Sequence, residues 1–365
     1  MTAQLRVGLV GTGFIGSVHA RAIRSTGAAL VAVAASTPDR SRESGRRLAV
    51  DTAFDTALDL VTSDDIDVVH VATPNDVHAE LSLAALGAGK HVVCEKPLAL
   101  SVADAEELVA AAQQADRIGA VPFVNRFYPM AREARSRVSA GGCGVVHTVH
   151  GSYLQDWLLS PDADNWRVDA RRGGASRAFA DIGSHWCDLA EWITGDRISE
   201  LVASTSTVLT ERVPDGGQDG RTVDTEDVAS LLFRTANGAS GVLTVSQVAA
   251  GRKNQLRIEV DATEHSVCFD QSRPDQLWIG GPHDSRVVVS DPEGLSVEAR
   301  PYAMLPPGHA QGFHDCFDAF VGDVYRSIAQ GSPVDGLPTF ADGARSARIV
   351  EAVLASADKR SWTEV

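Results

Sequence analysis

The chain has 365 residues, 44% of them hydrophobic and 22% charged, which is the composition of an ordinary globular protein of a length that predicts two domains. Its 33 basic and 48 acidic side chains give a net charge of -15, which repels phosphate backbones and anionic lipid headgroups, so we do not expect nucleic acid as a partner. No apolar run reaches the roughly 20 residues that span a bilayer, and the N-terminal stretch is too short for a signal peptide, so we expect no membrane association and a cytoplasmic location.

Through residue 124, short β-branched runs alternate with helical patterns. The runs are LRVGLV, LVAVAA, DVVHVAT, HVVCEK and AVPFV, and amphipathic stretches separate them. Such alternation predicts an α/β domain with a parallel, doubly wound sheet that helices cover on both faces. We therefore expect a first domain over residues 1–124.

After Asn125 the pattern changes to one helix, Pro129–Ser139, followed by strands with few helices between them. The expected strands are Val145–Leu154, Leu201–Leu209, Val228–Phe233, Ala239–Val248, Gln255–Val260 and Ser266–Asp270. They predict an α+β domain with a large, open, mostly antiparallel sheet over residues 125–365. Of two helical patterns after Gly308, we expect the second, at about residues 339–357, to pack back on the core.

The first strand runs into the sequence GTGFIG and then into a helical pattern, which is the required context of a GxGxxG dinucleotide fingerprint. The first glycine permits the tight turn, the second lets the backbone approach the pyrophosphate, and the third allows close helix packing. The helix N-terminus attracts the phosphate charge. The predicted contacts in this turn are Gly11, Gly13, Phe14, Ile15 and Gly16.

The second strand ends without the carboxylate that binds the ribose 2′-hydroxyl of NAD. Ser36, Thr37 and Arg40 stand there instead, and two hydroxyls with a guanidinium suit a 2′-phosphate better. The sequence thus predicts NADP or NAD and favours NADP slightly. Two alternatives remain open, because Asp39 could turn toward the ribose and Arg40 could be a solvated helix residue.

Four motifs occur in a characteristic order: GTGFIG, the stretch TPN with a histidine three residues later, the triplet EKP, and DIGSH followed by Asp188. In that order and at those separations the chain resembles the Gfo/Idh/MocA oxidoreductase family, whose members include glucose-fructose oxidoreductase and inositol dehydrogenases. The resemblance covers essentially the whole chain. It implies a Rossmann domain followed by an open sheet domain, with the substrate between them near the nicotinamide.

The resemblance also implies residue roles by matching position. Lys96 corresponds to the active-site lysine of the family, and Asp181 and His185 correspond to its catalytic aspartate and histidine. The Lys96–Pro97 bond is a candidate cis peptide. The expected cofactor site on the nicotinamide side comprises Thr73, Pro74, Asn75, His78, Glu95 and Lys96.

The chemistry of these side chains agrees with those roles. Removing a hydride from a carbinol carbon requires that the hydroxyl proton leave too, so the site needs a base and a donor that stabilises the developing alkoxide. His185 suits the first role and Lys96 the second, with the pKa of the lysine lowered by the positive oxidised nicotinamide. If residues 181–191 start a helix, Asp181 and His185 share one face, where the aspartate orients the imidazole or contacts substrate. Taken singly, an N-cap aspartate, a helix-start histidine and a surface lysine explain the same residues.

The irregular segment 155–183 combines aromatic rings with carboxylates, amides and guanidinium groups. Rings cover the apolar side of a sugar and polar groups bond its hydroxyls, so we expect a sugar or polyol substrate. The segment could equally seal an oligomer interface, and its arginines also allow an anionic substrate. The expected substrate contacts are Lys96, Asn125, Arg126, Tyr153, Trp157, Trp166, Arg167, Asp181 and His185.

The predicted function is NAD(P)-dependent hydride transfer between nicotinamide and a secondary hydroxyl or keto carbon of a sugar or cyclitol. The alternatives are a glycoside-processing enzyme that uses the cofactor transiently in oxidation and elimination, and a non-catalytic cofactor-binding regulator. We expect a homodimer or homotetramer paired through the second sheet. No metal site is predicted, because the spacing of His185, Asp181, Asp188, His309 and His314 is not diagnostic of zinc. Five cysteines without CxxC spacing fit a reducing compartment.

Overall fold

The computed structural model describes residues 4–163, 165–213 and 220–365, which form two compact units. One unit contains the chain up to Val124 together with Phe313–Ala347, and the other contains Asn125–Gly312 with Arg348–Val365. The segment Phe313–Ala347 follows the second sheet in the chain, which is why sequence order alone assigned it to the second domain. Its contacts place it with the first unit.

The first unit is built on a six-stranded parallel sheet in the order β3-β2-β1-β4-β5-β6. This order is that of a doubly wound fold, which reverses between β1 and β4 and carries ligands at the carboxyl ends of the strands there. The three residues of β3 are too few to give a periodic signal, so the sequence did not predict that strand. The strands are β1 Arg6–Val10, β2 Ala29–Ala34, β3 Thr52–Phe54, β4 Val68–Val71, β5 His91–Cys94 and β6 Gly119–Ala120.

Helices of the first unit begin where short polar side chains cap them. Thr37 accepts a hydrogen bond from the Arg40 backbone N–H at the start of α2, and Ser101 does the same for Asp104 in α5. Helix α9 packs against α1, where Phe317 and His19 have ring centroids 5.2 Å apart. The helices are α1 Phe14–Ser25, α2 Pro38–Leu48, α3 Ala57–Val61, α4 His78–Gly87, α5 Val102–Ala115 and α9 Phe313–Gln330.

The second unit contains a nine-stranded sheet in the order β16-β15-β14-β13-β7-β12-β11-β8-β17. All neighbours are antiparallel except β12 and β7, so the predicted mostly antiparallel sheet is confirmed. The sequence did not predict strands β15 and β16, which form a hairpin at one edge of the sheet. The strands are β7 Val146–Leu154, β8 Ile198–Ser206, β11 Val228–Thr235, β12 Ser240–Ser246, β13 Gln255–Ala262, β14 Ser266–Asp270, β15 Gln276–Gly280, β16 Ser285–Val289 and β17 Thr363–Glu364, with a separate ribbon of β9 Glu211–Arg212 and β10 Arg221–Thr222.

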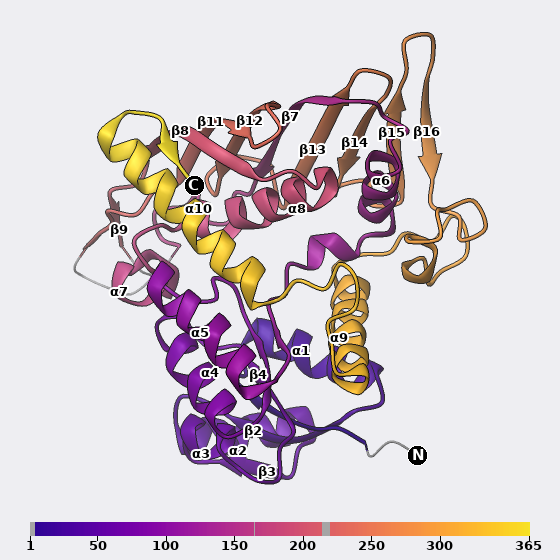
Figure 1. Cartoon of the computed structure of the whole chain (residues 1–365). Helices are drawn as coiled ribbons and strands as arrows, with labels where there is room; N and C mark the ends of the chain where they lie inside the picture. The colour runs from indigo at the N-terminus through magenta and orange to yellow at the C-terminus, as the bar shows by residue number, and fades with distance from the viewer. Residues whose placement is uncertain (1–3, 164, 214–219) are drawn as a thin grey trace. The chain divides into compact units, whose positions relative to one another are not determined.

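Helices α6 (Pro129–Ser139) and α8 (Ser184–Thr194) cover one face of this sheet (Figure 1), α6 over β14 and β15 and α8 over β7 and β13. Gly151 makes room for this packing, since a Cβ there would lie 2.9 Å from Nε1 of Trp186. The short helix α7 (Ala170–Gly173) lies in the irregular segment. Helix α10 (Phe340–Lys359) bears Phe340, which packs on Gly119, and Ser356, which accepts a hydrogen bond from the Ala203 N–H of β8. In the described residues, no helix is long and apolar enough to cross a membrane.

Candidate active site

The three glycines of the GTGFIG turn have the distinct surroundings that their predicted roles require. Gly11 has φ +87° and a Cβ there would lie 2.3 Å from the Ala72 carbonyl oxygen. A Cβ on Gly16 would lie 2.1 Å from the Gly11 carbonyl oxygen, whereas one on Gly13 would meet nothing within 4 Å. The first and third glycines therefore close the turn, and the second leaves its backbone open to a ligand.

The N-terminus of α1 suits an anion. Its N-cap, Gly13, makes no side-chain capping bond, and its first turn contains no acidic residue. The first N–H groups of a helix lack intrahelical acceptors and carry the positive end of the helix dipole. A cation lies beside the turn as well, because Arg47 donates to the Thr12 carbonyl oxygen at 2.6 Å and to Ser17 Oγ at 2.9 Å. These residues fit a pyrophosphate. The sequence did not point to Arg47, because it lies at the end of α2, 35 residues after Thr12.

The three residues predicted to select the cofactor phosphate lie together after β2. Arg40 Nη1 donates to Ser36 Oγ at 3.1 Å, and Thr37 caps the helix that carries the arginine. Asp39 pairs with Arg42 at 2.7 Å, and its side chain is 94% exposed. In this structure Asp39 is therefore directed to solvent.

The loops after β4 and β5 are joined by one buried histidine. His78 places Nε2 3.0 Å from the Thr73 carbonyl oxygen and Nδ1 2.8 Å from that of Pro97. The Lys96–Pro97 peptide is cis, as the sequence led us to expect. Thr73 Oγ1 is buried without a hydrogen-bond partner among the described residues, which fits a polar group of a nicotinamide. The predicted residues Thr73, Pro74, Asn75, His78, Glu95 and Lys96 thus occupy two loops that His78 holds together.

Charges in these loops are set by burial and by each other. Burial alone would lower the pKa of His78, but Cys94 and the two carbonyl oxygens outweigh it and raise that pKa to about 9. Because a carbonyl oxygen can only accept, both ring nitrogens of His78 must donate, so the geometry also requires an imidazolium. Burial would raise the pKa of Glu95, but the His19 hydrogen bond and the charges of Lys96 and His78 lower it.

In the second unit, Asp181 lies in a π-helical turn, Phe179–Gly183, that continues into α8. Such turns are rare and frequently occur at functional sites. Asp181 Oδ2 accepts a hydrogen bond of 2.6 Å from Gln247 Nε2, and Oδ1 lies 3.7 Å from Arg167 Nε. Gln247 is fully buried just after β12, and no motif in the sequence pointed to it.

Tyr153 lies near His185 and within the electrostatic influence of Asp181. Its ring centroid lies 6.4 Å from that of His185. Burial, with a further contribution from the Asp181 charge, raises the pKa of Tyr153, so its hydroxyl is a donor at ordinary pH. The structure thus brings together three of the predicted residues, Tyr153, Asp181 and His185, with Arg167 at the aspartate.

The irregular segment is anchored by a buried ion cluster that the sequence did not reveal. Asp227 pairs with both Arg177 and Arg212, and all three side chains are buried. Arg212 also donates to the carbonyl oxygens of Leu158 at 2.8 Å and Ser160 at 2.9 Å. The backbone of residues 158–163 is therefore held by the Arg212 guanidinium of β9.

Trp157 and Trp166, both predicted substrate contacts, make polar and cationic contacts within the second unit. Trp157 Nε1 donates to Gln155 Oε1 at 2.8 Å, and the Arg167 guanidinium lies 4.4 Å from the Trp166 ring centroid. Arg126 is buried and pairs with Asp188, its Nε lying 2.8 Å from Oδ2. The buried Asp188 carboxylate therefore orients Arg126.

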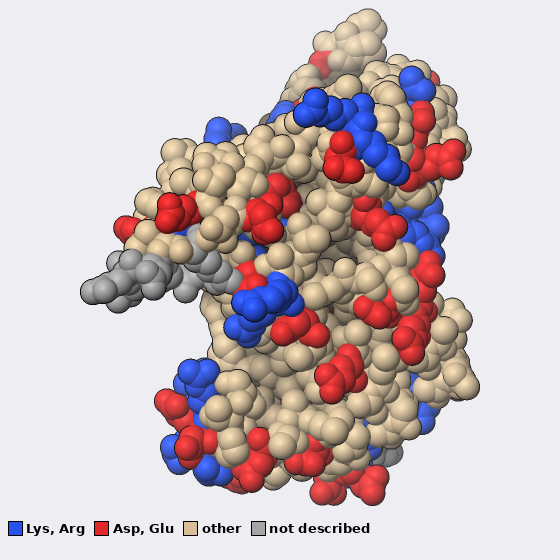
Figure 2. Space-filling view, turned by 90° about the vertical axis from the view of Figure 1, so that its left-hand side faces the viewer, with Lys and Arg blue, Asp and Glu red and all other residues tan. Residues whose placement is uncertain are grey.

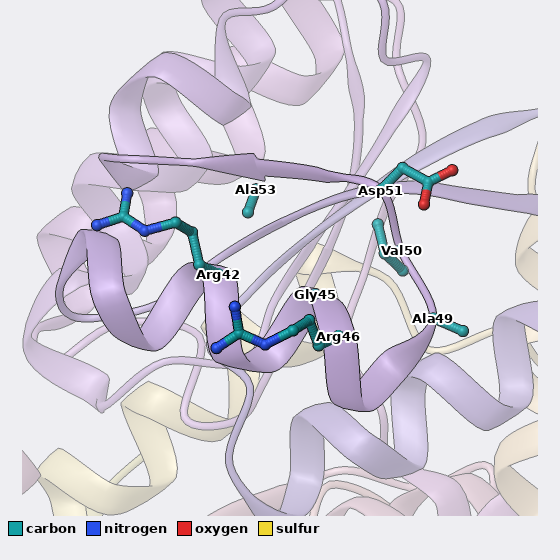
Figure 3. A pocket seen from close by; sticks show the side chains of 7 residues that line it. All are labelled: Arg42, Gly45, Arg46, Ala49, Val50, Asp51 and Ala53. Atoms are coloured by element: carbon teal, nitrogen blue, oxygen red, sulfur yellow. The ribbon is translucent and has the colours of Figure 1, made fainter.

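Other charged features lie apart from these clusters. A hollow of about 420 Å³ between α2 and the segment that follows it is lined by Arg42 and Arg46 (Figure 3), and it contains none of the predicted residues. One group of side chains in the described residues is close enough to share a metal ion, His150, Glu259 and Asp261. None of these is a predicted site residue. On the face shown in Figure 2, basic side chains are interspersed with acidic ones.

A doubly wound sheet with an open glycine turn and a second unit bearing a Tyr–Asp–His cluster define a dinucleotide-dependent oxidoreductase. The family model described as an oxidoreductase family with an NAD-binding Rossmann fold matches residues 5–123, and the model of the GFO/IDH/MocA C-terminal domain matches residues 131–268. The chain belongs to the Gfo/Idh/MocA oxidoreductase family. The predicted family, fold class, oxidoreductase function and NAD binding are confirmed.

Two curated relatives illustrate the similarity. Levoglucosan dehydrogenase of Pseudarthrobacter phenanthrenivorans is 32% identical over 99% of this chain and 98% of the relative, and myo-inositol 2-dehydrogenase of Thermotoga maritima is 30% identical over 80% and 79%. A structure of levoglucosan dehydrogenase in complex with NADH and levoglucosan has a TM-score of 0.93 at 31% identity, covering 100% of this chain and 99% of the other. A structure of an inositol dehydrogenase homologue from Azotobacter vinelandii with NAD+ has a TM-score of 0.88 at 27% identity, covering 100% and 98%.

Proposed function

We propose that this chain is a sugar or cyclitol dehydrogenase that moves a hydride between nicotinamide and a secondary hydroxyl or keto carbon, with Lys96, Asp181 and His185 as catalytic residues. The observation that carries the proposal is the cluster of Tyr153, Asp181 and His185, in which a protonated phenol and an oriented carboxylate accompany an imidazole. When bound, the nicotinamide supplies the hydride acceptor or donor.

Each proposed role follows from what the side chain can do. His185 takes the hydroxyl proton as the base, since imidazole titrates near neutral pH. Asp181 keeps its carboxylate in place through the bonds to Gln247 and Arg167, which leaves it able to orient the substrate or the imidazole. Lys96 donates a hydrogen bond to the developing alkoxide.

A polyol is the substrate class that these groups favour. Gln247 Oε1 is buried without a hydrogen-bond partner among the described residues, which fits a substrate hydroxyl near Asp181. Trp157 and Trp166 supply aromatic faces, and Arg167 supplies donors. Relatives named for levoglucosan and myo-inositol support the same class.

Purified protein with levoglucosan, the inositols and aldoses, each with NAD+ or NADP+, tests the proposal. Net formation of reduced nicotinamide from at least one polyol is the expected result. Lys96→Ala should abolish turnover while the affinity for cofactor stays within a few fold. Product without net cofactor change would instead indicate oxidation and elimination, and cofactor binding without turnover of any polyol would refute the enzyme.

We also propose that the chain accepts NADP and prefers it slightly over NAD. Arg40 and Ser36 already contact each other after β2, and Asp39 is exposed, so a guanidinium rather than a carboxylate is available to the ribose. Arg40→Ala should lower kcat/KM for NADP+ by roughly 10- to 100-fold, the value of a charged hydrogen bond, and leave that for NAD+ nearly unchanged. Arg42→Ala, on the same helix, is the control that should change neither. Equal losses with both cofactors in Arg40→Ala would refute the preference.

A homodimer or homotetramer through the second sheet completes the proposal. Residues of β11 alternate between buried and exposed, and the exposed set includes Leu232, 50% exposed, opposite Val242, 45% exposed. Adjacent exposed aliphatic side chains on a large sheet favour burial against a second copy. Light scattering at micromolar protein should give a multiple of the chain mass, and Leu232→Asp should reduce that mass. A monomeric mass for the native chain would exclude the assembly.

A cytoplasmic location is supported by the five free, buried cysteines.

A further inference from the structure

A chain of buried side chains in the first unit ends at the residue before Lys96. Tyr325 Oη lies 3.0 Å from His70 Nε2, and His70 Nδ1 lies 2.8 Å from His19 Nδ1. His19 Nε2 lies 3.0 Å from Glu95 Oε1. The four side chains come from α9, β4, α1 and the end of β5, and all are buried.

The hydrogen-bond directions follow from the carboxylate. An ionised Glu95 only accepts, so His19 donates through Nε2 and its Nδ1 is the acceptor in a neutral ring. His70 must then donate through Nδ1 and accept at Nε2. Tyr325 therefore donates its hydroxyl proton, and every donor in the chain points toward Glu95.

If the hydrogen bonds ran in the reverse direction, the buried Tyr325 hydroxyl would have no acceptor for its proton in the part of the chain that the structure describes. If His19 were an imidazolium, His70 would donate to the Tyr325 oxygen, and that hydroxyl has no second partner among the described residues. Burial lowers the pKa of His70 well below its ordinary value, and burial raises that of Tyr325. Both groups are therefore neutral in either hydrogen-bond direction, so the choice rests on the Tyr325 hydroxyl, which the reverse direction would leave as a costly unpaired buried donor.

The other oxygen of Glu95 faces the backbone of the lysine. The Lys96 N–H donates to Glu95 Oε2 at 3.2 Å. His19 from α1 donates a hydrogen bond to this carboxyl, and the charged groups that act on it are the imidazolium of His78 from α4 and the Lys96 ammonium itself. Glu95 is therefore held on one side by the histidine chain and on the other by the residue proposed to donate to substrate.

We propose that Tyr325, His70 and His19 are positioning residues that hold the Glu95 carboxylate ionised and in one orientation beside Lys96. The inference rests on the proposed function only for the importance of the lysine. Opposite charges stabilise each other, so the ionised Glu95 that the histidine chain holds stabilises the Lys96 ammonium. This effect reaches the lysine only through Glu95.

The protonation of Lys96 can be measured without catalysis. The chain has four lysines, Lys90, Lys96, Lys253 and Lys359, so acetylation by a limiting amount of acetic anhydride can be followed at each one by peptide mass spectrometry. The rate at each pH reports the fraction of free amine, because only the neutral amine reacts. Lys253 and Lys359 serve as internal references.

Glu95→Gln should raise the acetylation rate of Lys96 at neutral pH about tenfold, which is a shift of about one pH unit, the lower end of the effect of a neighbouring opposite charge. His70→Leu should raise it about threefold, because the chain no longer fixes the carboxylate. His70→Asn should restore the native rate, since its amide can donate in place of Nδ1. The loss of kcat should follow the same order, largest in Glu95→Gln, smaller in His70→Leu and absent in His70→Asn.

Ser327→Ala is the matched control. Ser327 is buried on the same helix as Tyr325, and its hydroxyl donates to the Asp323 carbonyl oxygen at 2.7 Å and accepts from the Val334 N–H at 3.0 Å. Its loss should lower stability without changing the Lys96 rate. If His70→Leu does not fold, Tyr325→Phe removes the donor to His70 with a single atom lost and should raise the rate in the same direction.

Two results would overturn the proposal. A folded His70→Leu or Tyr325→Phe protein with a native Lys96 rate would show that the chain does not hold the carboxylate. A rate increase by His70→Leu that persists in the Glu95→Gln background would show that the histidine acts by another route. A change in acetylation without any change in kcat would leave the positioning intact and refute the catalytic role of Lys96 instead.

Discussion

Adding one methyl group at Gly13 separates cofactor binding from folding. Gly13 has φ -71° and ψ -158°, which any residue adopts, and an added Cβ meets nothing within 4 Å. We therefore expect Gly13→Ala to change the free energy of unfolding by less than about 1 kcal/mol. The same methyl at Gly16 lies 2.1 Å from the Gly11 carbonyl oxygen, and the Gly11 backbone is held in place because its N–H donates to the Ala34 carbonyl oxygen at 2.9 Å. Gly16→Ala should cost about 1 to 3 kcal/mol or more, as overpacking does.

Gly13→Ala should weaken cofactor binding, although it leaves the free energy of unfolding nearly unchanged. A methyl group on Gly13 occupies the open side of the turn, where the backbone N–H groups of the α1 N-terminus reach the pyrophosphate. Loss of one hydrogen bond to a charged group costs about 1.5 to 3 kcal/mol, so the Kd for NADH should rise roughly 10- to 100-fold in Gly13→Ala.

Calorimetric titration with NADH measures the affinity, and thermal unfolding without cofactor measures the stability. Gly87→Ala is the control, because a Cβ at Gly87, the last residue of α4, also meets nothing within 4 Å. It should leave both quantities near native. Native NADH affinity in Gly13→Ala, or native stability in Gly16→Ala, would refute this assignment of the glycines.

Three further predictions concern buried polar groups. Arg212→Met should lower the free energy of unfolding by about 3 to 5 kcal/mol and open residues 155–163 to proteolysis, because it leaves the buried Asp227 charge less compensated; denaturant titration and limited digestion would detect both effects. The pKa of His78 is raised from 6.5 to about 9, so its contribution of up to ~3 kcal/mol is complete below pH 6.5 and lost as the pH rises through 9. Unfolding free energies across that window should fall in the native protein and stay level in His78→Gln. Gln247→Ala should lower kcat roughly tenfold with unchanged NADH affinity, since Asp181 loses its 2.6 Å hydrogen bond, and an unchanged kcat would remove Gln247 from the site.

Local patterns in the sequence were enough for the architecture. The alternation of β-branched and amphipathic runs predicted the parallel sheet, and Pro129–Ser139 was predicted with the bounds that α6 has. The glycine turn and the EKP and DIGSH motifs predicted the family. These features depend on neighbouring residues, whose backbone preferences and periodicity are visible in any short window.

Only the tertiary structure decided which distant side chains meet. Tyr325 lies 255 residues after His70, and Gln247 lies 66 residues after Asp181, yet each pair shares a hydrogen bond. The π-helical turn at Phe179–Gly183 and the grouping of α9 with the first unit likewise had no local signal. Such contacts arise when elements pack and their buried polar groups must find partners, a requirement that the order of residues along the chain does not disclose.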